Sequence, residues 1–168
     1  MCDLITGLMI ASTGLGVMGD IQEGKANAAN AEYQQQVALM NAGFTGEKIT
    51  DAAVRGAESE QQVRREGAQV IGSQRATMGA TGIDMTFGSP LDMILGTAQE
   101  IEMDAFRSRQ NTGREIQDLE QTRANQLADA GALGSAAKNY RTAGVFNALG
   151  TAASGAAGVS KYRASIGA

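Results

Sequence analysis

The chain has 168 residues with no histidine, no tryptophan, one cysteine and 4% aromatic residues, so it lacks most side chains used in catalysis and metal binding. This composition disfavours an enzyme of any class, and we predict no catalytic residue, no cofactor and no metal site. The formal net charge of -4 conceals a basic tail, because no Asp or Glu follows Asp129, whereas Lys138, Arg141, Lys161 and Arg163 do.

Small and polar side chains, chiefly Ala, Gly, Ser, Thr, Gln and Asn, dominate the sequence. Such side chains bury little apolar area per residue, so a compact monomer is poorly supported. Helices that pack against each other and against neighbouring copies would supply the missing burial. We therefore expect a homo-oligomer.

The first segment, residues 1–21, is apolar. Between residues 4 and 19 it has sixteen residues, or about 24 Å as an α-helix, which is short for a membrane span. It either inserts into a membrane, obliquely or beside the C-terminal run, or is a buried anchor within an assembly. Its candidate membrane-contact or oligomer-packing residues are Leu8, Ile10 and Gly14.

The N-terminal segment does not have the pattern of a secretory signal, because Asp3 precedes the apolar run and no Lys or Arg occurs before Lys25. The single Cys2 cannot form an intramolecular disulfide, so we expect cytoplasmic synthesis and an unmodified thiol rather than lipidation. Residues 14–19 match the dinucleotide-binding pattern G-x-G-x-x-G. The sequence that follows reads as helix without a strand, which indicates a chance match.

Residues 22–78 form a first predicted arm, without proline and with a loose helical row of apolar residues. Residues 90–141 form a second, with a clearer amphipathic pattern. As helices the two arms would be about 85 Å and 78 Å long. The near match predicts an all-α fold, an extended hairpin of two long helices that assembles as an oligomer.

The turn between the arms is assigned to residues 79–89. Gly79, Gly82 and Gly88 supply positive-φ freedom, Ser89 is expected to cap the second helix, and Pro90 to occupy its first position.

Glycines inside the arms each cost roughly 1 kcal/mol relative to alanine in a helix interior. Two explanations remain open, close packing of two backbones and helices that open at low cost during function. The glycines concerned are Gly43, Gly46, Gly56, Gly67, Gly72, Gly96 and Gly113.

The mixed charges between Glu47 and Arg75, and between Glu100 and Arg123, predict solvated helix faces. Basic and aromatic residues do not alternate there, so we predict no sequence-specific nucleic-acid binding. The acidic residues of 100–104 stand at alternate positions and would face different directions on a helix, which indicates a surface charge run rather than a calcium site.

The last segment, residues 142–168, contains an uncharged run from 142 to 160, about 28 Å long as a helix and close to the thickness of a bilayer core. Its small residues recur in rows of four, as in closely packed membrane helices. Either these helices cluster in a membrane and line a watery pore, or they stack in solution on identical neighbours. The packing candidates are Gly144, Ala148, Ala152 and Ala156 in one row, and Gly150, Ser154 and Gly158 in a second.

Several stretches in this order resemble one family. The most specific is Gly82-Ile-Asp84, Gly88-Ser-Pro-Leu-Asp92 and Thr97-Ala-Gln-Glu-Ile-Glu-Met-Asp-Ala105. Others are Met1-Cys2-Asp3, Gln22-Glu-Gly-Lys-Ala26, Ala31-Glu-Tyr33, Asn41-Ala42 and Ile71-Gly-Ser-Gln-Arg-Ala76. Together they resemble the internal virion proteins of short-tailed bacteriophages, of the small internal core class, over nearly the whole chain.

The resemblance implies an ejection protein that sits in the capsid lumen under the portal with larger internal core proteins. Such a protein leaves with the genome and helps form a conduit through the host envelope, usually at the outer membrane. The family brings no catalytic residues. Two other functions remain open, a permanently soluble head-to-tail connector or scaffold-like adaptor that stays in the capsid, and a translocon or inner-rod component of a secretion system.

Overall fold

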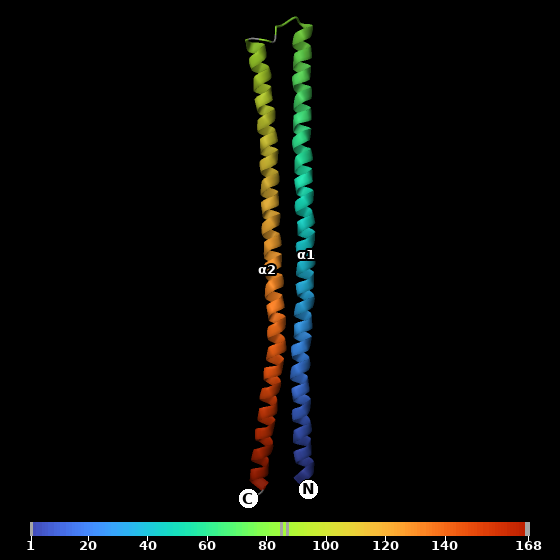
Figure 1. Ribbon diagram of the computed structural model, residues 1–168, viewed down its shortest axis with the longest axis vertical. Coiled ribbons are helices and arrows are strands. Elements are labelled where there is room, and N and C mark those ends of the chain that lie inside the picture. The colour runs from blue at the N-terminus through green and yellow to red at the C-terminus, as the bar shows by residue number, and fades with distance from the viewer. Residues whose placement is uncertain (1, 85, 87, 167–168) are drawn as a thin grey trace. The chain divides into compact units, whose positions relative to one another are not determined.

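A computed structural model describes residues 2–84, 86 and 88–166, with side chains for residues 7–84, 86 and 88–165. All regular secondary structure in these ranges lies in two helices, α1 (Cys2–Ala80) and α2 (Ser89–Ile166) (Figure 1). The predicted all-α class is therefore confirmed. The two apolar ends are not separate elements, because each continues the long helix beside it. The predicted state of the Cys2 thiol falls outside the described side chains.

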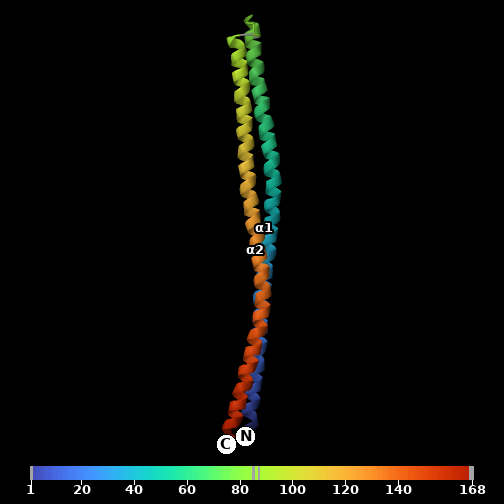
Figure 2. The same ribbon diagram turned by 60° about the vertical axis from the view of Figure 1, so that its left-hand side comes forward.

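The chain divides into two compact units. Unit 1 contains residues 1–41 and 125–168, and unit 2 contains residues 42–124. Within each unit an α1 segment and an α2 segment lie side by side and antiparallel (Figure 2). Unit 2 includes the turn and is thus a helical hairpin.

Alanine forms most of the contact between the helices. In unit 1, Ala28, Ala31 and Ala137 make a buried cluster, and Ala130 and Ala148 are also buried. In α2, Ala130, Ala137 and Gly144 recur at steps of seven, the repeat that keeps one seam facing a partner helix. The buried residues of unit 2 are Ala42, Thr45, Ala52, Gly67, Ile94 and Ala105. Among the described residues no large side chain is fully buried, so each pair of helices buries little apolar area.

The two helices of unit 1 approach backbone to backbone at Gly24 and Gly144. A Cβ built on Gly24 would lie 2.8 Å from Cα of Gly144 and 2.9 Å from the carbonyl oxygen of Tyr140. Both of these are backbone atoms, which cannot rotate away. Glycine is therefore required here for the two helices of unit 1 to pack.

The interior glycines of unit 2 fall into three groups. The spaces beside Gly56 and Gly67 are filled by the side chains of Thr112 and Ile101, so close packing accounts for these two glycines. A Cβ at Gly46 would make only ordinary contact, with Arg123. At the remaining four an added Cβ would meet nothing within 4 Å, so packing within the chain does not explain Gly43, Gly72, Gly96 and Gly113.

Helix α1 ends in a Schellman motif. Gly82 has a φ of 73°, its N–H donates to the carbonyl of Gly79 at 3.2 Å, and the N–H of Ile83 donates to the carbonyl of Met78 at 3.1 Å. This is the paired pattern that satisfies the last carbonyls of a helix and places glycine just past its end. Gly79 itself lies inside α1 without a positive φ, so the prediction of positive φ there is wrong, whereas it is confirmed for Gly82 and Gly88.

Helix α2 begins one residue earlier than predicted. The carbonyl of Gly88, whose φ is 74°, accepts the N–H of Asp92 at 3.1 Å, so Gly88 occupies the cap position and Ser89 the first helical position. Pro90 is then second. It is tolerated there because the first turn of a helix leaves its N–H groups without intrahelical partners.

Replacing Gly82 should destabilise unit 2. In Gly82→Ala a residue with a Cβ must adopt the left-handed backbone conformation, which costs about 1 kcal/mol. We expect urea unfolding followed by circular dichroism to show that loss. Gly79→Ala is the matched control, because Gly79 is helical and its Cβ would meet nothing. Equal stability of the two variants would contradict the role of Gly82.

Candidate functional site

Both ends of the chain line one groove of unit 1, with a volume of about 580 Å³. Helix α1 contributes Ile10, Thr13, Gly14 and Val17, which share one face at the spacing i, i+3, i+4 and i+7. The two apolar ends predicted from the sequence are thus brought together on one surface. Helix α2 contributes the remaining lining residues, Ala152, Gly155, Ala156, Val159, Ser160 and Arg163.

Threonines close the space between the helices beside this groove. The side chain of Thr13 fills the position that a Cβ of Gly155 would take, and the methyl group of Thr151 stands 3.0 Å from the Cβ position of Gly16. The hydroxyl of Thr13 donates to the carbonyl of Met9 at 2.8 Å, so its polar group is satisfied within α1. Small side chains therefore fill the space between the helices next to the groove.

A polar contact fixes the register of the two apolar ends. The hydroxyl of Thr151 donates to a carboxylate oxygen of Asp20 at 2.6 Å, in a partly buried position. Hydrogen bonds to a charged acceptor are among the stronger ones in proteins. The sequence does not predict this pair, because 131 positions separate the two residues and nothing in either local sequence indicates the other.

The first predicted packing row divides between two surfaces. Gly144 and Ala148, the latter 4% exposed, lie in the seam between the helices, whereas Ala152 and Ala156 line the groove. A step of four residues turns about 40° around a helix, so three steps turn about 120°. The row therefore leaves the seam and reaches the side of the helix pair.

The second predicted row and Leu8 do not pack within the chain. Gly150 and Gly158 are exposed, and a Cβ on either would meet nothing within 4 Å. Ser154 is exposed and its hydroxyl donates to the carbonyl of Thr151 at 3.0 Å. Leu8 is 69% exposed and does not line the groove. These four residues remain candidates only for contacts outside the chain.

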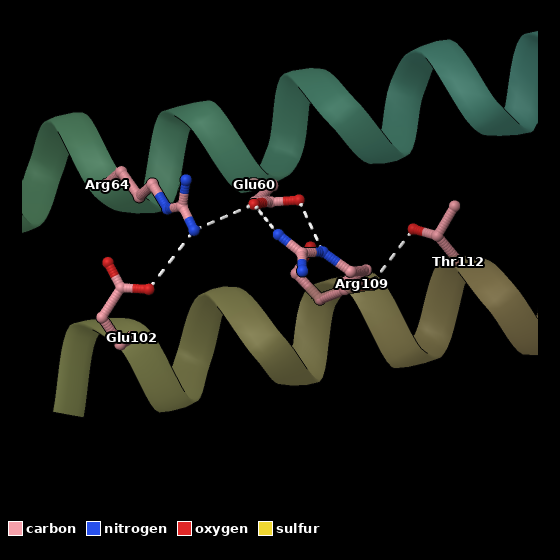
Figure 3. Close-up of polar contacts among 6 residues, drawn as sticks. Glu60, Arg64, Glu102, Arg109 and Thr112 are labelled. Atoms are coloured by element: carbon pink, nitrogen blue, oxygen red, sulfur yellow. Dashed lines mark hydrogen bonds and ion pairs between the residues drawn. The ribbon is translucent and has the colours of Figure 1, made fainter. Parts of the chain in front are cut away.

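Unit 2 carries an ion network between its helices. Figure 3 shows Glu60 of α1 between Arg64 of the same helix and Arg109 of α2. Arg109 Nε donates to Glu60 at 3.1 Å and its terminal nitrogen forms a second bond, while Arg64 lies 3.2 Å from Glu60 and 3.3 Å from Glu102. The Glu60 side chain is 18% exposed. The prediction of simple solvated faces is therefore wrong for Glu60, which links the helices.

Protonation of Glu60 should weaken unit 2. The hydrogen bond from Arg109, together with the positive charges of Arg109 and Arg64, holds the pKa of Glu60 below its ordinary value of 4.5. A lowered folded-state pKa adds stability above the ordinary value, and this stability is lost as pH falls through the lowered one. We expect Glu60→Gln to melt at a lower temperature than the unmodified protein near neutral pH, and the difference between them to be smaller near pH 3.

Thermal melts followed by circular dichroism at both pH values measure this difference. Glu58→Gln, which changes an exposed carboxylate two residues away, is the control. A difference between Glu60→Gln and the unmodified protein that is the same at both pH values would contradict the role of the charged carboxylate.

No helix within the described ranges combines enough length and apolar character for a membrane span. The described residues also include no group of three or more acidic or cysteine side chains placed to hold a metal ion. Asp104 instead pairs with Arg107 at 3.0 Å. Residues 14–19 lie inside α1, without the strand-to-helix turn of a dinucleotide site.

Comparison with known proteins gives no match to a protein-family model, a curated protein or a solved structure. Function is therefore inferred from the residues and contacts of the chain itself, together with the resemblance centred on residues 82–105.

Proposed function

We propose that the chain is an internal virion protein of a short-tailed bacteriophage, of the ejection class that its sequence resembles. In this role it belongs to the core assembly at the portal, together with copies of itself and larger core proteins. It is released with the genome and helps form a channel across the host cell envelope, at the outer membrane.

The main support for this proposal is that small side chains lie between the helices and large apolar ones lie on the surface. Alanine and glycine fill the seams between helices, while large apolar side chains face outward. Soluble monomers rarely leave so much large apolar surface uncovered, and such surface typically marks contact with protein or membrane. Partners are thus expected along both units. The exposed large residues include Leu8, Leu15, Met18, Tyr33, Met40, Phe44, Val54, Met103, Phe106, Phe146 and Leu149.

Pairing of the two apolar ends gives further support. The Asp20 to Thr151 hydrogen bond and the Gly24 to Gly144 contact hold both ends together in unit 1. A channel-forming protein needs its lipid-compatible segments to act as one surface. The exposed apolar side chains of the two ends, such as Leu15 and Leu149, provide such a surface, while the charged pairs of Figure 3 belong to unit 2.

Tracking the protein through infection tests the proposal. Cells are infected with purified particles, emptied capsids are separated from the cell envelope, and the protein is detected in each fraction with an antibody. We expect it in the envelope fraction, whereas the portal protein, as control, stays with the capsids. Retention of the protein in emptied capsids would contradict the ejection role and favour the permanently soluble adaptor.

A further inference from the structure

Unit 1 carries a groove and an apolar ridge on different sides of the same helix segment. The ridge consists of Leu8 and Leu15, which are 69% and 72% exposed and do not line the groove. Each stands two residues before a groove residue, Ile10 or Val17. Two residues correspond to about 200° around a helix, so the ridge and the groove face nearly opposite directions.

The spacing of the ridge matches the spacing of the groove. Leu8 and Leu15 are seven residues apart, as are Ile10 and Val17 on one wall, and Ala152 and Val159 on the other. Seven residues advance a helix by about 10.5 Å, so ridge and groove share one repeat. In packed helices, side chains at such a repeat act as knobs that enter holes between the side chains of the facing helix. Gly14 and Ala156 provide the small side chains here.

The chain exposes enough surface to bury part of it against further copies of itself. The chain exposes 11694 Å². A folded monomer of 17.4 kDa is expected to expose about 7,900 Å², which leaves an excess of roughly 3,800 Å². One partner of a stable interface buries about 800 Å². The excess is large enough for two interfaces on every copy.

We infer that the groove of unit 1 receives the ridge of a second copy of this chain. Because each copy offers a groove on one side and a ridge on another, the contact is heterologous, with two different surfaces meeting. Repetition of such a contact closes into a ring or continues as a tube, and does not stop at a symmetric dimer. This inference rests on the self-association part of the proposed function and does not require ejection.

Two complementary variants test the pairing in the full-length protein. Gly14→Leu fills the groove and should preserve the fold, because a Cβ at Gly14 meets nothing within 4 Å. Leu8→Gln with Leu15→Gln removes the ridge and keeps good helix formers. Gly150→Leu is the control, since Gly150 is equally open but lies outside the groove. Circular dichroism verifies that each variant remains helical, and Ala156→Leu replaces Gly14→Leu if helicity falls.

Sedimentation equilibrium measures the outcome. We expect the unmodified protein and Gly150→Leu to form assemblies much larger than a dimer, and each groove or ridge variant to sediment at the mass of one chain, 17.4 kDa. An equimolar mixture of the two variants retains one intact groove and one intact ridge. It should therefore sediment at twice the mass of one chain and no higher.

Several results would overturn the inference. These are a monomeric unmodified protein, a Gly14→Leu variant that assembles normally, or a mixture of variants that stays monomeric. A monomeric protein that binds vesicles of phosphatidylglycerol, and loses this binding in Gly14→Leu, would assign the groove to lipid instead. If the protein is monomeric but still reaches the host envelope, only the pairing of groove and ridge is contradicted. If it assembles but stays in emptied capsids, only the ejection role is contradicted.

Discussion

Gly24→Val is expected to separate the two helices of unit 1. The new side chain would clash with backbone atoms of Gly144 and Tyr140, so the helices must move apart and lose their alanine contacts. We expect a loss of about 3 kcal/mol, which is large for a pair of helices that buries only small side chains. Hydrogen exchange should show faster exchange in residues 125–166, while unit 2 keeps its protection.

Gly19→Val is the matched control, with the same change in the same helix. A Cβ at Gly19 meets nothing within 4 Å, so the stability should change by no more than about 0.5 kcal/mol. Gly144→Val should reproduce the effect of Gly24→Val from the other side of the contact, because a Cβ there would stand 3.0 Å from the carbonyl oxygen of Asp20. Equal stability of Gly24→Val and Gly19→Val would rule out the close contact between backbones.

Replacing the four open glycines of unit 2 by alanine should give the largest gain in stability. Each change removes a helix penalty of roughly 1 kcal/mol. None of the added Cβ atoms meets another group within 4 Å, so the gains should add to about 4 kcal/mol in urea unfolding. The variant combines Gly43→Ala, Gly72→Ala, Gly96→Ala and Gly113→Ala.

Gly56→Ala is the control for this variant. The Thr112 side chain occupies the space beside Gly56, so this change should destabilise unit 2 rather than stabilise it. Stabilisation by Gly56→Ala as well, or no gain from the fourfold variant, would contradict the division of the glycines into packed and open ones.

The fourfold variant also probes why the glycines are present. If helices α1 and α2 must both open during passage through a phage tail, phage carrying the variant should assemble normal particles but deliver less DNA, because opening costs about 2 kcal/mol more for each helix. Potassium release from infected cells and the content of purified particles measure the two steps separately. Stabilised protein with normal delivery would show that opening is not the reason for these glycines.

Much of the fold could be predicted because its signals are local. The single proline at position 90 and the positive-φ glycines 82 and 88 mark the one break between long helical patterns. At the turn the predicted helix boundaries were wrong by one or two residues, since Gly79 and Ser89 both belong to helices, whereas at their outer ends the helices continue through residues 2–21 and 142–166, which were predicted as separate segments. Hydrogen bonds between specific backbone groups decide such ends, and residue type only biases them.

The candidate surface was predicted in part. Ile10, Gly14, Ala152 and Ala156 line one groove, whereas Gly150, Ser154 and Gly158 do not. All of them have the same small or apolar character in the sequence. Whether each residue lines the groove depends on the direction in which its side chain points from the helix, relative to the seam between the helices. Residues far away in the sequence set the position of that seam.

The sequence by itself determined two helices, the turn between them and a chain poor in large buried side chains, because helix periodicity, glycine and proline act within a few residues. The tertiary structure alone decided which glycines touch a neighbouring backbone, which alanines form the seam, and that Asp20 bonds Thr151. The physical reason is register. Each residue turns the helix by about 100°, so only the long-range contacts that fix the two helices against each other assign a small side chain to the seam, the groove or the solvent.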